Sequence, residues 1–236
     1  MGIKLQGNVV LWVAMAIMVS TRLWLGAVVS RRRDQQLIGN LAALVRSWAC
    51  QVALLITFDG FAAYREAFER VFSDRRRGLR GRTVRCVWPC LTLAQVVKHN
   101  ANGTLQLARY VLRGSCTMLV RLRRQTQGEG TINTAFIERL NGSFRAYLAP
   151  LVRRTHGLAR ADATVTDAIF LFGCVYNFCR VHTSLQRLTP AMAAGLTDHR
   201  WTVTELLWCR PRPQLPSSTL LSGATRLQRS ISELRR

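Results

Sequence analysis

Apolar and polar positions in the first third of the chain follow the periods of strands and helices. Residues 9–18 and 23–30 are apolar runs separated by a short polar stretch, which predicts the two buried strands of a hairpin. Residues 35–48 carry apolar side chains at helical spacing, as expected of an amphipathic helix. Residues 52–58 predict another short strand and residues 61–72 a second helix. This β-β-α-β-α order predicts an α/β domain with a central sheet.

The middle of the chain predicts a second hairpin and two further helices. Residues 91–98 and 104–111 flank Asn102-Gly103, a dipeptide that favours positive backbone φ angles and hence a tight β-turn. Residues 133–149 predict an amphipathic helix that ends before Pro150. Residues 164–179 predict an almost wholly apolar helix, which should therefore be internal. Structural roles at the end of that helix are expected for Asn177 and His182.

The net charge of the chain indicates that this α/β domain has an anionic partner. There are 34 Lys and Arg residues against 12 Asp and Glu, a formal net charge of +22. Such a field predicts nucleic acid or an anionic membrane surface as the partner. Almost all the cations are Arg, which binds phosphate bidentately. A GC-rich genome explains the Arg preference equally well, but it does not explain the net charge.

Residues 73–85 hold six Arg and two Gly and are expected to form a mobile loop. Two interpretations stay open, a solvated loop and a contact to the DNA backbone. The residues predicted to bind DNA are Arg75, Arg76, Arg77, Arg80, Arg82 and Arg145.

The ends of the chain bear on where the protein works. The apolar run from residue 9 to residue 19 is shorter than the twenty or so residues of a membrane span, although a small membrane-associated protein led by residues 9–30 is an alternative. From residue 208 to residue 236 the composition predicts a disordered basic tail, which leaves a catalytic-core domain over residues 1–207. Seven scattered cysteines without zinc-ligand spacing are expected to be reduced thiols of a cytoplasmic protein.

Two carboxylates lie at positions where α/β proteins often have catalytic or metal-binding residues. Asp59 directly follows a predicted strand, and Glu138 shares the polar face of a predicted helix with Asn141 and Arg145, at i, i+3 and i+7. Brought together, the two carboxylates could hold a divalent metal through oxygen ligands. Asp59-Gly60 could equally be only a turn, and Glu138 could form a surface ion pair with Arg145.

Four segments resemble a known family in the same order along the chain. Residues 136–145 (FIERLNGSFR) resemble the segment around the catalytic Glu of insertion-sequence transposases with an integrase-type core. Residues 176–191, which contain YNFCRVHTSL and TPA, resemble the stretch that closes that core. Residues 56–64 and 12–22 resemble its second and first catalytic strands more weakly. The resemblance covers about residues 5–207.

This resemblance implies an RNase H-like α/β fold, with a central mixed sheet flanked by helices and a β-hairpin insertion. It also implies two Asp and one Glu that bind two Mg²⁺ ions about 3.5–4 Å apart. Asp59 matches the second carboxylate and Glu138 the third, so both are the expected catalytic residues and metal ligands. Met18 stands where the family has the first Asp, and a thioether is a poor Mg²⁺ ligand. Metal binding should therefore be weakened or lost.

The first core strand begins by residue 9, which leaves no room for the DNA-recognition domain that usually precedes this core. The implied function is that of a truncated, catalytically impaired transposase core that binds DNA and does not associate with membranes. A non-catalytic nucleic-acid-binding protein is the alternative, and a homo-oligomer stays open.

Overall fold

The computed structural model describes residues 1–5, 9–50, 52–77, 82–101, 104–127, 130–152 and 159–209. The chain divides into two compact units, the first spanning Met1–Thr202 and the second beginning at Val203 with helix α7 (Val203–Trp208). The tail predicted over residues 208–236 lies outside the described part from residue 210 onward. No helix within the described ranges has both the length and the apolar character needed to cross a membrane.

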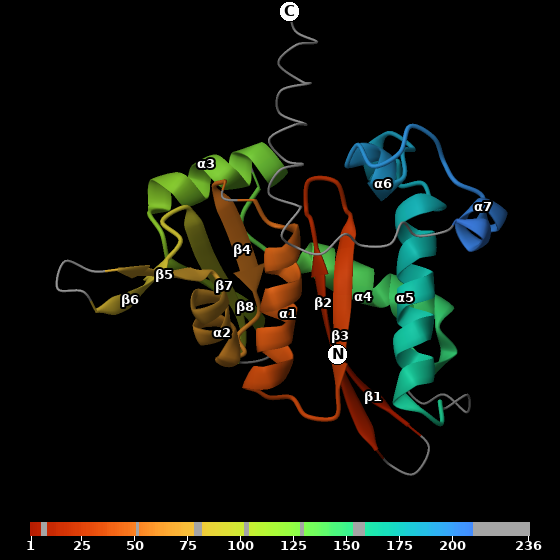
Figure 1. Cartoon of the computed structure of the whole chain (residues 1–236), viewed down its shortest axis with the longest axis horizontal. Helices are drawn as coiled ribbons and strands as arrows, with labels where there is room; N and C mark the ends of the chain where they lie inside the picture. Colours follow the sequence, from red (N-terminus) through yellow and green to blue (C-terminus); the bar gives the residue numbers. More distant parts are fainter. Residues whose placement is uncertain are drawn as a thin grey trace, which may run out of the picture. The chain divides into compact units, whose positions relative to one another are not determined.

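The first sheet of the larger unit is a three-stranded antiparallel sheet (Figure 1). Its strands are β1 (Gly2–Lys4), β2 (Val10–Ile17) and β3 (Trp24–Ser30), in that order. The β2–β3 pair, in register from Trp12↔Ser30 to Ile17↔Trp24, confirms the predicted hairpin. Strand β1 was not predicted, because three residues are too few to show a period.

The second sheet is mixed. Its strands are β4 (Leu54–Phe58), β7 (Leu91–Ala101) and β8 (Thr104–Arg113), with β4 parallel to β7 and β7 antiparallel to β8. The predicted hairpin is confirmed, although its Asn102-Gly103 turn lies outside the described residues. The predicted mixed α/β class is confirmed as well. Among the described strands, however, β2 and β4 belong to different ladders, so the expected central sheet is divided at this point.

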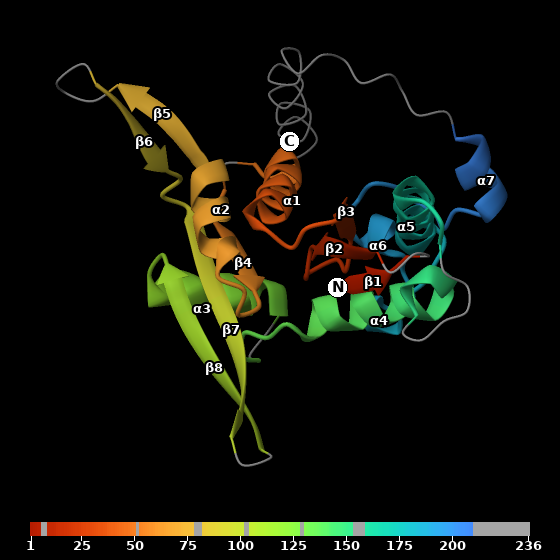
Figure 2. The same cartoon turned by 90° about the horizontal axis from the view of Figure 1, so that it is seen from below.

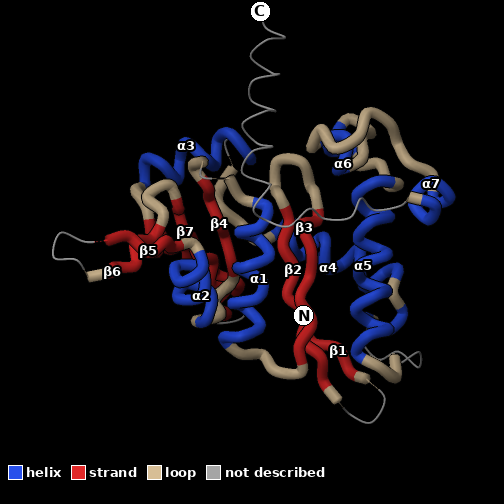
Figure 3. Tube along the Cα trace, in the orientation of Figure 1, coloured by secondary structure: helices blue, strands red, loops and turns tan. Residues whose placement is uncertain are grey.

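Residues 73–85 are mostly not a loop, and that prediction is wrong. Strands β5 (Ser73–Arg77) and β6 (Thr83–Val87) form an antiparallel hairpin that projects from the side of the domain (Figure 3). Its base is held where Asp74 accepts hydrogen bonds from Arg46 at 2.7 Å and from the Trp88 indole at 2.8 Å. Arg46 also lies over the Trp88 ring, with its guanidinium carbon 4.9 Å from the ring centroid.

The four predicted helices are confirmed to within two residues at each end, while one long helix was missed. They are α1 (Gln35–Trp48), α2 (Ala63–Val71), α4 (Ala135–Tyr147) and α5 (Asp162–Phe178), and the missed one is α3 (Cys116–Gln127). The helix predicted over 164–179 is not internal as expected, because Phe170 and Leu171 on it are exposed. Short helical turns occur at η1 (Ala149–Leu151), η2 (Thr183–Leu185) and α6 (Pro190–Ala193). Helix α1 begins where the Asp34 carboxylate accepts a hydrogen bond from the Leu37 amide at 3.0 Å, a regular N-cap.

Strand β2 separates two cores because its side chains alternate between two faces. Leu11, Val13 and Met15 pack into the core formed with α4 and α5. Trp12, Ala14 and Ala16 point the other way, into the core formed with α1, α2 and β4. Figure 2 shows the outcome, with α1 and α4 on opposite sides of the β2–β3 pair.

Helix α5 is joined to β3 by a buried polar contact. The Asn177 side chain accepts a hydrogen bond from the Trp24 amide and donates one to the Trp24 carbonyl, both at 2.9 Å. One turn earlier on the helix, Gly173 lies against the Trp24 ring so closely that any added Cβ would overlap it. The expected structural role of Asn177 is confirmed, since it pairs with backbone groups that would otherwise be buried without a partner.

We expect Gly173→Ala to lower the free energy of unfolding by about 1–3 kcal/mol, because the methyl group must displace a buried indole. Gly142→Ala is the matched control: it also lies within a helix, and nothing would touch its added Cβ within 4 Å. That change should stabilise the protein by about 0.5–1 kcal/mol. Urea unfolding of both variants tests the contact, and equal effects would show that Gly173 does not set the approach of α5 to β3.

Candidate functional site

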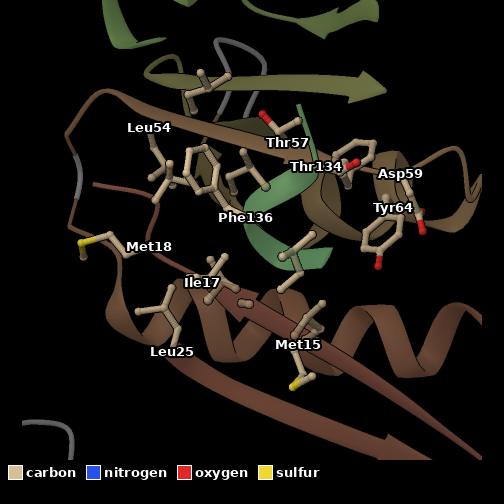
Figure 4. A pocket seen from close by; sticks show the side chains of 18 of the residues that line it. Met15, Ile17, Met18, Leu25, Leu54, Thr57, Asp59, Tyr64, Thr134 and Phe136 are labelled. Atoms are coloured by element: carbon tan, nitrogen blue, oxygen red, sulfur yellow. The ribbon is translucent and has the colours of Figure 1, made fainter. Parts of the chain in front are cut away.

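A cavity of about 400 Å³ lies between β2 and β4, with the first turn of α4 beside it. Met18, Asp59 and Glu138 all line this cavity, although a shared lining does not by itself place their side chains in contact. Most of the remaining lining is apolar, as the side chains of Ile17 and Phe136 show in Figure 4. The cavity lies where the two sheets fail to join, between an edge of β2 and an edge of β4.

Asp59 sits at the carboxyl end of β4, as the strand pattern predicted. One carboxylate oxygen accepts a hydrogen bond from the Phe61 amide at 3.1 Å, which closes a tight turn before α2. The Asp59 carbonyl accepts another from the Gln95 side chain of β7, also at 3.1 Å. The turn interpretation therefore holds for one carboxylate oxygen of Asp59. Because the residue is exposed, the other oxygen can contact a ligand.

Glu138 is engaged by two neighbours. Its Oε1 forms an ion pair with Lys98 of β7 and accepts a hydrogen bond from the Thr134 hydroxyl at 2.8 Å. The hydrogen bond from Lys98 is the main cause that holds the pKa of Glu138 below its usual range, against a smaller opposing effect of burial. The interpretation that Glu138 pairs with Arg145 is therefore wrong, since the ion pair forms with a strand 40 residues earlier.

Met18 lies at the start of the β2–β3 turn and is 40% exposed. Its amide donates to the Leu23 carbonyl at 2.8 Å, which fixes the backbone at the mouth of the turn. In Figure 4, Met18 and Asp59 lie at opposite ends of the cavity. The side chain at position 18 therefore borders the cavity without meeting the carboxylate of Asp59.

These residues do not fit a centre of two Mg²⁺ ions. Such a pair needs several shared oxygen ligands, but the first family position holds the thioether of Met18, and Glu138 at the third already faces an ammonium group. In the part of the chain that the structure describes, there is no group of three or more His, Cys, Asp and Glu side chains placed to hold a metal ion.

Sequence reasoning missed Tyr64, which lines the same cavity from α2. Its ring stacks on Phe58 with centroids 4.9 Å apart and meets Phe61 edge-on. Burial, helped by the nearby Asp59 carboxylate, raises the pKa of Tyr64 to about 12, so its hydroxyl stays protonated. An aromatic residue five positions after a strand-end Asp, on the first turn of a helix, was the available signal.

The arginines predicted to bind DNA fall in two places. Arg75, Arg76, Arg77 and Arg82 are exposed on or beside the β5–β6 hairpin, and Arg80 lies outside the described residues. Arg145 is separate from them, half-buried on α4.

The hairpin register also places a further arginine, which was not predicted to bind DNA, next to these residues. Arg85 stands directly opposite Arg75, and Arg77 shares their face of the hairpin because side chains alternate along a strand.

No protein-family model, curated protein sequence or solved structure matches this chain significantly. The transposase resemblance therefore stays a prediction that rests on the residues quoted for it.

We expect Lys98→Gln to raise the pKa of Glu138 toward its ordinary value near 4.5, because the first cause of the lowered pKa is removed. Carboxyl-detected NMR titration measures this directly. Arg65→Gln is the control, since Arg65 pairs with Glu69 on α2 and its replacement removes an equal charge elsewhere. An unchanged Glu138 pKa in Lys98→Gln would contradict the ion pair.

Proposed function

We propose that this protein is a DNA-binding member of the insertion-sequence transposase group, with an RNase H-like core that has lost most of its catalytic power. The observation that carries DNA binding is the β5–β6 hairpin. Within the described residues, no carboxylate forms an ion pair with its exposed arginines at positions 75, 76, 77, 82 and 85.

Like charges directly opposite each other destabilise a β-hairpin, and here Arg75 faces Arg85. A phosphate backbone relieves that repulsion, and it suits guanidinium groups through bidentate hydrogen bonds. The projecting shape of the hairpin in Figure 3 leaves both of its faces open to such a partner. This arrangement favours contact with nucleic acid over the solvated loop that was the alternative.

The family assignment has support from the order of the elements. An antiparallel hairpin (β2–β3) is followed by α1, by a strand with Asp59 at its carboxyl end, and by a helix whose first turn carries Glu138. These are the elements in which the resemblance expects the first, second and third acidic positions. The divided sheet between β2 and β4 is a departure from a continuous central sheet.

Impaired catalysis follows from the chemistry at the cavity. Two-metal phosphodiester transfer needs one ion to activate the nucleophile and another to stabilise the leaving oxygen. With Met18 as a soft neutral donor and Lys98 against Glu138, too few oxygens remain to hold both ions. The protein would then hold DNA without cutting it, which is also the behaviour of the alternative, a non-catalytic nucleic-acid-binding protein.

We expect duplex DNA binding to be sequence-tolerant and steeply dependent on salt. The triple variant Arg75→Gln, Arg76→Gln, Arg77→Gln should reduce the slope of log affinity against log salt by about 0.9 for each phosphate that it no longer neutralises. The matched control removes three exposed arginines elsewhere in the first unit, namely Arg32, Arg121 and Arg160. Equal slopes for the two triple variants would show that net charge, and not the hairpin, determines binding.

We also expect DNA binding not to require Mg²⁺, which should weaken it only as an added salt does, and supercoiled DNA to remain intact with either Mg²⁺ or Mn²⁺. The reason is the shortage of oxygen ligands at the cavity, which removes the metal from both binding and cleavage. The measurement is a plasmid-nicking assay with the wild-type chain. Nicking that depends on Mg²⁺ and disappears in Asp59→Asn would contradict impaired catalysis and restore an active site at this cavity.

A further inference from the structure

A second cavity, of about 240 Å³, opens beside the first and has a different chemical character. The β2–β3 turn, helix α4 and the chain after α5 enclose it. Four basic side chains line it, Arg22, Arg139, Arg180 and His182, and no carboxylate is among its described lining residues. Three guanidinium groups and a histidine therefore surround one space, in a chain whose acidic residues are few.

Arg22 is held in place from several sides. Its backbone is left-handed, with φ at 59°, so the turn presents this side chain in a conformation that few non-glycine residues adopt. The guanidinium donates to the Val19 carbonyl and lies over the Phe136 ring, 3.9 Å from its centroid. Burial lowers the pKa of Arg22, against an opposing effect of Tyr176, and the charge of Arg139 lowers it further.

Two nitrogen atoms of side chains that line this cavity are buried and have no hydrogen-bond partner in the structure. They are Nη1 of Arg180 and Nε2 of His182. The Arg180 guanidinium lies over the Tyr147 ring at 4.2 Å, and the His182 ring meets Tyr176 edge-on at 4.8 Å. Both side chains are therefore fixed by aromatic contacts.

Burying such groups without a partner is costly. An unsatisfied buried donor costs about 1–3 kcal/mol, and more if it is charged. Burial, and then the charges of Arg180 and Arg22, lower the pKa of His182, so a neutral ring faces the neighbouring guanidinium groups. An anion among these residues would offset the repulsion between the arginines, and it would offer acceptors to the buried nitrogens once their side chains turn toward it.

We propose that this cavity binds a phosphate group, held by Arg22, Arg139 and Arg180 with His182 as a further donor. Ser143, Thr183 and Ser184 also line the cavity, and their hydroxyls suit the remaining phosphate oxygens. Ile17 and Phe136 line both cavities, so a group bound here lies next to the Asp59–Glu138 cavity. The identification of that group as a DNA phosphodiester rests on the proposed function; binding of phosphate itself does not.

Binding of inorganic phosphate to the full-length chain, measured by calorimetry at constant ionic strength in chloride, tests the proposal. The double variant Arg139→Gln, Arg180→Gln should weaken that binding by about tenfold or more, since one hydrogen bond to a charged group is worth about that factor. Arg121→Gln, an exposed position on α3, should change it by less than about twofold. A wild-type chain without saturable phosphate binding, or a double variant that binds as wild type does, would overturn the proposal.

Arg180 packs on Tyr147, so its replacement could disturb the fold. Arg139→Gln alone keeps the test open, because Arg139 is exposed on α4 and its loss should still weaken phosphate binding several-fold. Circular dichroism melting of each variant separates a loss of folding from a loss of the ligand. A folded Arg139→Gln protein with unchanged phosphate affinity would count against the site.

A single-stranded oligothymidylate identifies the source of the phosphate. If the double variant loses affinity for both inorganic phosphate and the oligonucleotide, the cavity takes a phosphodiester. If only phosphate binding falls, the cavity takes the free anion and the phosphodiester assignment is overturned. The proposed function is tested by a different measurement. It depends on duplex binding through the β5–β6 hairpin, which is measured as the slope of duplex affinity against salt, so the two proposals can fail independently.

Discussion

The alternation of side chains along β2 is the constraint on which the rest of the domain depends. One face of this strand supplies Leu11, Val13 and Met15 to the core beneath α4 and α5, and the other supplies Trp12 and Ala14 to the core beneath α1. A shift of the strand by one residue would exchange the two sets and place indole and methyl groups in the wrong cores. The positions of both cavities follow from this strand, since Ile17 at its end borders each of them.

The apolar parts of the fold were predictable because burial leaves a period in the sequence. The β2–β3 hairpin and α1 were found in this way. Helix α3 was missed because only Leu119 and Leu122 on it are buried, too few to show a helical stripe among its arginines and glutamines. The β5–β6 hairpin was missed for a related reason, since its first strand contains three consecutive arginines and buries no apolar face.

The candidate site was predictable only in part. The ends of strands and the first turns of helices are local features, so Asp59 and Glu138 could be singled out from their own segments. The residues that pair with these carboxylates, and so limit which ligands they can hold, come from distant parts of the chain. Lys98 reaches Glu138 from β7, 40 residues earlier, and no local pattern indicates that pair. The basic cavity is a clearer case, because Arg22, Arg139 and Arg180 belong to three segments that converge only in the folded chain.

The facing arginines of the β5–β6 hairpin link the folding of this protein to its surroundings. A net charge of +22 opposes compaction, and Arg75 beside Arg85 places part of that repulsion within one structural element. Added salt screens the repulsion and so favours the folded chain, while the same salt releases a polyanion from it. Under the proposed function, a bound nucleic acid would act as the counterion instead, and by mass action it would add to the stability of the fold. Resistance to unfolding would then be greatest with DNA bound, and lowest for the protein alone in dilute buffer.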